Sequence, residues 1–255
     1  MVGILTAPLV ASAISRGSFE TFSWSDLVMA WVAWVVFLNG GTLVATFSLI
    51  LMVTGAAIAF LVTPAFGLVT AGCVIMSVLY SHDAFRWKSI PGRDLAINIV
   101  GYGGATTLSG IMAGQVALGA ISVSPDLAGW LLIAGFGFLF GSFYPLTQIY
   151  QLDTDRDRGD LTLASAIGTG KALTLAIVLG IIAAIFLAGA AWLWNDAFIP
   201  LLPLLLALVV WMAMLAVWHR RSARMDAAAH EKGMYIALII WAVIDLSVLI
   251  SRYAN

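Results

Sequence analysis

The chain has 255 residues, of which 62% are hydrophobic and only 10% are charged, and its formal net charge is −1. Soluble domains carry about 25% charged residues, so this composition excludes an ordinary soluble protein, and a mean hydropathy of +1.03 indicates an integral membrane protein. A single cysteine, Cys73, excludes an internal disulfide framework.

Long apolar segments follow one another along the whole chain. Their length and their lack of strict alternation favour membrane-spanning helices over barrel strands. We therefore predict an all-α integral membrane protein with nine transmembrane helices in a single bundle, forming one polytopic domain over residues 1–255. The predicted spans are 2–15, 27–45, 46–63, 66–81, 95–122, 127–149, 166–194, 198–218 and 233–251.

The second and third predicted spans adjoin without a polar loop. Residues 27–63 are one apolar stretch, far longer than the roughly 20 residues that one helix needs to cross a bilayer. The polar residues Asn39 to Thr42 come too early to turn the chain between two full spans. We take this as a hypothesis that a loop is lacking near Ala45–Thr46.

Basic residues divide unevenly between the two sides of these nine spans. Only Arg16 and Arg252 fall on one side, and ten Lys and Arg residues fall in or close to the connections after the even-numbered spans. Positively charged loops stay in the cytoplasm, so we expect an inner-membrane protein whose N-terminus is cytoplasmic. The ten are Arg86, Lys88, Arg93, Arg156, Arg158, Lys171, Arg220, Arg221, Arg224 and Lys232.

Charge is most concentrated between the sixth and seventh spans, in the sequence YQLDTDRDRGDLTL at 150–163. If the sixth helix continued through it, Gln148, Gln151 and Asp155 would form one polar stripe at about 100° per residue. Gly159 would then end that helix, and a new one would start after Thr162. Carboxylates beside basic residues suit a Mg²⁺ ion that binds phosphate oxygens. Taken alone, the cluster fits equally a solvated loop whose Asp and Arg side chains pair with each other.

The longer pattern is more specific. The string Gln148-x-x-Gln151-x-x-x-Asp155-Arg156-x-x-Gly159-x-x-Thr162-Leu163 resembles the second aspartate motif of the UbiA superfamily of intramembrane prenyltransferases. The sequence from Tyr80-Ser81 through the basic residues to Pro91-Gly92 is similar to that family's cytoplasmic loop after the fourth helix. The resemblance covers nearly the whole chain.

This resemblance implies nine helices around a central cavity and a cytoplasmic active site. It implies a Mg²⁺-dependent enzyme that moves a prenyl group from a prenyl diphosphate to a lipophilic acceptor, aromatic acceptors included, among membrane lipids. We expect no nucleic-acid partner. It implies Asp155 and Asp153 as metal ligands, with Gln151 beside them as a catalytic group. The substrate-binding residues that it implies are Asn39, Tyr80, Arg86, Lys88, Asn98, Gln148, Arg156 and Lys171.

Two departures from the family pattern keep alternatives open. Gln151 stands where an aspartate is usual, and no first aspartate motif follows the second span, where Asn39 leads into apolar sequence. If no loop is lacking near 45–46, a degenerate, non-catalytic member is one alternative. A terpene cyclase or synthase that uses the same donor without an acceptor is another. A transporter using Lys171 and Asp245 would predict internal repeats, which the sequence does not display.

Overall fold

The fold is described from a computed structural model. The structure describes residues 28, 29, 32, 45–120, 124–157, 159–195 and 197–253, with backbone alone for 45, 46, 153 and 156. All regular elements in this part of the chain are helical, which confirms the all-α prediction. The first predicted span, most of the second and Asn39 lie outside the described residues.

Six helical segments are long and apolar enough to cross a membrane, so the chain is an integral membrane protein. Several of them are built from shorter elements joined end to end. In chain order they are Pro64–Ser81 (α4), Arg93–Ala117 (α5, Arg93–Ile97; η3, Asn98–Ala105; α6, Thr106–Ala117), Leu127–Ile149 (α7), Thr169–Trp194 (α10), Ile199–Arg224 (η4, Ile199–Leu201; α11, Leu202–Arg221; η5, Ser222–Arg224) and Ala227–Tyr253 (α12).

A further apolar helix, α3 (Ala45–Val62), precedes them and packs against α4. Ala45 and Thr46 are its first two residues, so the two positions are helical neighbours in this structure. The predicted spans from 46–63 onward each correspond to one of these helices, with ends that differ by a few residues. The largest differences are at the end of the segment Ile199–Arg224, predicted at residue 218, and at the start of α12, which begins at Ala227 instead of residue 233.

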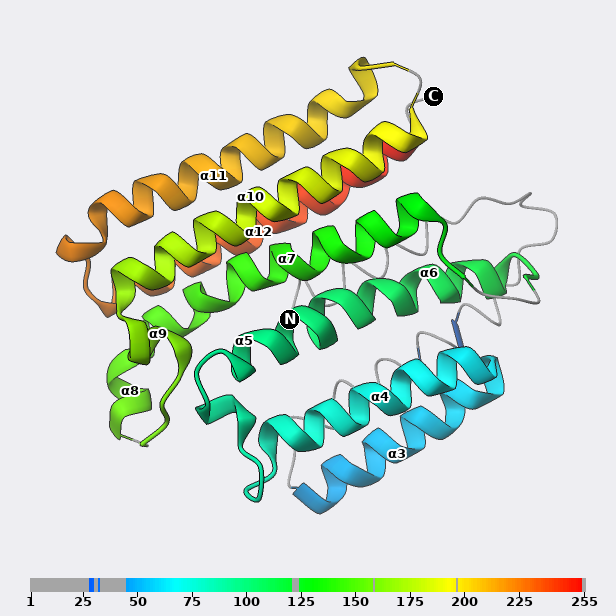
Figure 1. The fold of residues 1–255 in the computed structure, drawn as a ribbon, viewed down its shortest axis with the longest axis horizontal. Coiled ribbons are helices and arrows are strands. Elements are labelled where there is room, and N and C mark those ends of the chain that lie inside the picture. Colours follow the sequence, from blue (N-terminus) through cyan, green and yellow to red (C-terminus); the bar gives the residue numbers. More distant parts are fainter. Residues whose placement is uncertain are drawn as a thin grey trace.

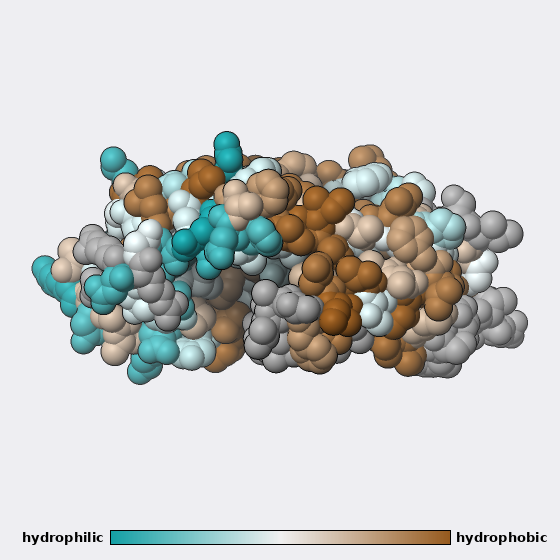
Figure 2. All heavy atoms as spheres, turned by 90° about the horizontal axis from the view of Figure 1, so that it is seen from below, coloured by the Kyte–Doolittle hydropathy of each residue, from teal (hydrophilic) through white to brown (hydrophobic). Residues whose placement is uncertain are grey.

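The helices run in alternating directions, so the connections gather at two ends of the bundle (Figure 1). Three of these connections lie at the same end, on the left in Figure 1: α4 to α5 (82–92), α7 to α10 (150–168) and α11 to α12 (222–226). Figure 2 shows hydrophilic residues gathered toward this end and hydrophobic ones over most of the remaining face. Hydrophobic residues that face outward there are suited to contact lipid tails.

The core lies between α7, α10, α11 and α12. It contains fully buried Leu132 and Phe136 from α7, Leu173 from α10 and Trp211 from α11. The Trp211 indole donates a 3.0 Å hydrogen bond to the hydroxyl of Ser142, which itself donates to the Ala176 carbonyl at 2.7 Å. Helix α7 is therefore fixed against α10 and α11 by both packing and buried polar contacts.

Segment η3, residues 98–105, winds as a π-helix and packs closely on α7. A Cβ added at Gly103 would lie 2.5 Å from the Cα of Gly137, so this contact admits no side chain at position 103. Widened helical turns of this kind are rare and are frequently found at functional sites. Here the segment starts at Asn98, one turn beyond the α4–α5 connection.

Candidate active site

The candidate site lies where two connections meet at one end of the bundle. The α4–α5 connection carries the short helix η2 (Trp87–Ser89). The α7–α10 connection carries two short helices, α8 (Leu152–Asp157) and α9 (Leu163–Ile167). Two separate sets of polar contacts join these connections, one buried and one exposed.

The buried set centres on Asp94, in the first turn of α5, and we call it the buried anchor. It comprises the Asp94 and Gln148 side chains and the backbone N–H groups of Leu163 and Ala164. Asp94 is 0% exposed. Its Oδ2 accepts hydrogen bonds from Gln148 Nε2 at 2.8 Å and from the Leu163 N–H at 3.0 Å. Gln148 Oε1 accepts from the Ala164 N–H at 3.0 Å, so the start of α9 is held at two consecutive residues.

The other oxygen of Asp94 serves its own helix. Oδ1 accepts from the N–H groups of Gly92 and Leu95, both at 2.8 Å. An acidic side chain in the first turn also complements the helix dipole. Gly92 has a φ of 87°, a conformation that favours glycine, and this turn places its N–H toward the carboxylate.

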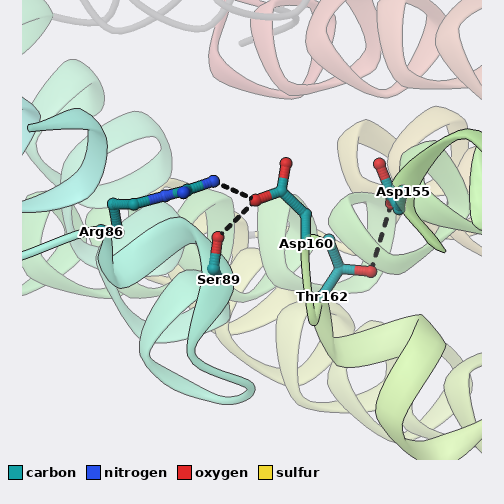
Figure 3. Close-up of polar contacts among 5 residues, drawn as sticks. All are labelled: Arg86, Ser89, Asp155, Asp160 and Thr162. Carbon is teal, nitrogen blue, oxygen red and sulfur yellow. Dashed lines mark hydrogen bonds and ion pairs between the residues drawn. The ribbon is translucent and has the colours of Figure 1, made fainter. Parts of the chain in front are cut away.

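The exposed set joins Arg86 and Ser89 to Asp160, and we call these three residues the exposed latch (Figure 3). Arg86 Nη2 lies 2.6 Å from Asp160 Oδ1, and Ser89 Oγ donates to the same oxygen at 2.7 Å. The hydrogen bond from Ser89, aided by the charges of Lys88 and Arg86, lowers the pKa of Asp160 below its ordinary value although partial burial opposes this. The backbone of Arg86 is left-handed, with a φ of 39°.

Asp155 lies on α8 and is only 8% exposed. Its Oδ2 accepts a 3.3 Å hydrogen bond from Thr162 Oγ1, as Figure 3 shows. The same hydroxyl accepts from the Ser165 N–H at 3.4 Å, so Thr162 is also the N-cap of α9. A new helix starting after Thr162 is thus confirmed, and the turn at Gly159, with a φ of 68°, follows α8 as expected.

Two tyrosines and an asparagine lie next to this region. The hydroxyls of Tyr80 and Tyr144 are 3.0 Å apart. Buried Asn98 donates from Nδ2 to the carbonyl of Asp94 at 2.7 Å. Tyr80 and Asn98 were predicted from different segments, and both lie around Asp94 in the structure.

The expected polar stripe of Gln148, Gln151 and Asp155 is wrong. Helix α7 ends at Ile149 and does not continue through the charged sequence, because the chain turns at Tyr150 and Gln151 before α8 starts. Gln148 is buried, whereas Gln151 is exposed and donates to the hydroxyl of Tyr150.

Lys171 is exposed in the first turn of α10, Arg86 is exposed, and Lys88 is half-buried. The side chains of Asp153 and Arg156 lie outside the described part of the structure. Direct contacts of all these residues with a substrate stay predictions.

Asp94 is the residue that our sequence reasoning missed. A signal was present, because a carboxylate that begins a membrane span is costly to bury and is usually functional or paired. It lies two residues after Pro91-Gly92, at the end of the connection whose sequence is similar to the family's loop.

We tested whether these residues fit the Mg²⁺ ion that the sequence predicts. Within the described residues, no group of three or more His, Cys, Asp or Glu side chains converges on one point. Mg²⁺ is usually held by one or two carboxylates together with substrate phosphates, so the donor set fits an ion that arrives with a diphosphate. Asp155 is better suited to this than Asp94, because each oxygen of Asp94 already accepts two N–H groups.

Comparison with known proteins identifies the family of the chain. A model of the UbiA prenyltransferase family matches residues 41–239. No curated protein matches the chain.

Solved structures of membrane proteins have the same fold. A UbiA homolog from Archaeoglobus fulgidus is 16% identical, with a TM-score of 0.68 over 99% of this chain and 94% of that chain. A structure of a UbiA homolog from the same organism, bound to GPP and Mg²⁺, has a TM-score of 0.64 at 16% identity, over 95% of this chain and 96% of that one. The apo structure of a UbiA homolog from Aeropyrum pernix K1 is 15% identical, with a TM-score of 0.66 over 97% of this chain and 96% of that chain.

Proposed function

Since this chain belongs to the UbiA prenyltransferase family, we propose that it transfers a prenyl group from a prenyl diphosphate to a lipophilic acceptor. The observation that carries the proposal is the position of Asp155. It is a nearly buried carboxylate, hydrogen-bonded to Thr162, at the end of the bundle where the basic connections gather. The A. fulgidus structures with DMAPP or GPP and Mg²⁺ support a diphosphate as the donor.

In this proposal Asp155, with Asp153, holds the cation against the diphosphate. When bound, Mg²⁺ neutralises charge on the leaving group. Arg86, Lys88, Arg156 and Lys171 balance the remaining negative charge. Tyr80, Asn98 and Asn39 line the donor site, and the surrounding apolar helices exclude water.

The chemistry that these residues would promote is simple to balance. The bond between C1 of the prenyl chain and the diphosphate oxygen breaks, and the electron pair leaves with the diphosphate. The acceptor then forms a bond to the allylic carbon and loses a proton. Exclusion of water protects the allylic cation until the acceptor reacts.

The test is pyrophosphate release by the purified protein in nanodiscs, with Mg²⁺ and prenyl diphosphates of several chain lengths. We expect Asp155→Asn to lower turnover by about 100-fold or more, as for loss of a group that stabilises developing charge. The matched control is Asp157→Asn, which removes an exposed carboxylate from the same helix and should leave turnover near wild type. Wild-type turnover in Asp155→Asn would refute the role of Asp155.

Products formed from the donor alone separate transfer from cyclisation. A hydrocarbon or alcohol released without any acceptor would favour a terpene cyclase or synthase on the same scaffold. No release of pyrophosphate from any donor would favour a non-catalytic member of the family.

We further propose that this end of the bundle faces the cytoplasm in the inner membrane, because most of the basic residues lie in the connections there or in the adjoining turns of the helices. The test uses single cysteines in a Cys73→Ala background, at exposed Ala84 and at exposed Ser124 on the opposite end. In intact cells an impermeant maleimide should label Ser124→Cys and spare Ala84→Cys. The reverse pattern would overturn the orientation.

A further inference from the structure

Asp94 makes contacts that reach far beyond its own helix. Two of its four accepted hydrogen bonds stay local, at Gly92 and Leu95. The other two come from residues 54 and 69 positions away in the sequence, Gln148 and Leu163. A residue needed only to cap α5 would not require this second pair.

The far contacts end on the backbone at one joint of the α7–α10 connection. Asp94 accepts a hydrogen bond from the N–H of Leu163, and Gln148 accepts one from the N–H of Ala164. Thr162 directly precedes them, and its hydroxyl donates to Asp155. A continuous series of contacts therefore runs from Asp94 through residues 162–164 to the carboxylate of Asp155.

These contacts are buried, and that gives them their strength. A buried N–H group that loses its acceptor is unfavourable because water does not replace the lost partner, so residues 163 and 164 have little freedom to move away from the anchor. Thr162, 9% exposed, is carried by the same backbone. Its hydroxyl can therefore present only a narrow range of positions to Asp155.

We propose that Asp94 is a positioning residue, which acts through the backbone at 162–164 to orient Asp155 toward a divalent cation. The inference rests on the proposed function for the cation. Residues that orient a metal ligand typically change metal affinity by about 10- to 100-fold when they are replaced. Asp94 itself needs no contact with the metal or the substrate.

The first measurement does not depend on activity. Hydrogen–deuterium exchange of the intact protein in nanodiscs follows the peptide that covers residues 160–166. Asp94→Asn replaces one carboxylate oxygen, Oδ2 or Oδ1, by an NH2 group, which cannot accept hydrogen bonds from N–H groups. We therefore expect faster exchange in this peptide and unchanged exchange in α10. Unchanged exchange at 160–166 would overturn the inference, whether or not the protein binds a metal.

The second measurement is binding of Mn²⁺, followed by electron paramagnetic resonance in the presence of a non-reactive prenyl thiodiphosphate. We expect Asp94→Asn to weaken Mn²⁺ binding by about 10-fold or more. The control Asp126→Asn removes another carboxylate that caps a helix, at the far end of α7, where it accepts from the Gly129 N–H at 2.7 Å. This control should bind Mn²⁺ as the wild type does.

A variant with a smaller structural effect keeps the test decisive if Asp94→Asn fails to fold. Thr162→Val removes the hydroxyl that contacts Asp155 and should weaken Mn²⁺ binding, and Thr162→Ser should restore it. Wild-type affinity in Asp94→Asn or in Thr162→Val would overturn the inference. If the wild type binds neither Mn²⁺ nor the analogue, the proposed function fails, and the exchange experiment still decides whether Asp94 holds the connection.

Discussion

The buried anchor and the exposed latch join the same two connections, yet their energetics differ. The anchor places the Asp94 carboxylate, which has no exposed surface, among four N–H donors. The latch places Asp160 between a serine and an arginine whose side chain is 44% exposed. Loss of a hydrogen-bond partner lowers stability more when the remaining group is buried, whereas exposed ion pairs contribute only about 0–1 kcal/mol to the free energy of unfolding. We infer that the anchor fixes the site and that the latch is readily opened.

The largest effect should follow loss of the whole anchoring carboxylate. Asp94→Ala leaves the Gln148 amide and the Leu163 N–H without acceptors, so we expect the free energy of unfolding to fall by about 3 kcal/mol or more. Unfolding by SDS in mixed micelles measures it. Asp126→Ala, the matched loss of a helix cap, should cost only about 1 kcal/mol, and an equal cost for the two would contradict the comparison.

Gln148→Leu should have the next largest effect. It keeps the approximate volume but leaves the Ala164 N–H unsatisfied, so we expect a loss of about 2 kcal/mol in the same unfolding experiment. This variant also sharpens the role that the sequence predicted for Gln148. A raised KM for the donor with unchanged stability would mean that Gln148 acts on the substrate and is not part of the anchor.

Loss of the latch should have a small effect on stability. We expect Asp160→Asn to change the free energy of unfolding by less than about 1 kcal/mol. The difference from wild type should shrink further in 1 M NaCl, where charges are screened beyond about 3 Å. The double variant Arg86→Asp/Asp160→Arg restores opposite charges and should match the wild type. A loss above about 2 kcal/mol for Asp160→Asn would mean that the latch stabilises the protein as strongly as the anchor does, and would contradict the comparison.

The smallest effect concerns pH. The pKa of Asp160 is lowered in the folded protein. The stability that the latch contributes is therefore fully present at pH values above the ordinary aspartate pKa of about 3.9, and it is lost as the pH falls through the lower pKa of the folded state. We expect a constant distance between spin labels at Ala84→Cys and Thr154→Cys from pH 8 to pH 5, and a longer one only below about pH 4. The same pair of labels in Asp160→Asn should show no such transition, and opening near pH 6 would contradict the assignment.

The sequence by itself determined the helical membrane class, the long apolar helices (α3, α4, the segment from α5 to α6, α7, α10, α11 and α12) and the family. Spans of apolar residues must satisfy their backbone internally in lipid, and this restricts the chain to helices. It also marked Asp155 and Thr162, because the motif that contains them is local. The capping of α9 by Thr162 was predictable for the same reason.

Only the tertiary structure revealed the anchor. Asp94, Gln148 and Leu163 are far apart in the sequence, and no local periodicity indicates that one carboxylate collects N–H groups from three elements. The break between α7 and α8 was equally hidden, since a helix continuing past Ile149 satisfies every local rule. In the structure α7 ends at Ile149 and α8 begins at Leu152, and the chain that follows brings the Leu163 and Ala164 N–H groups to Asp94 and Gln148.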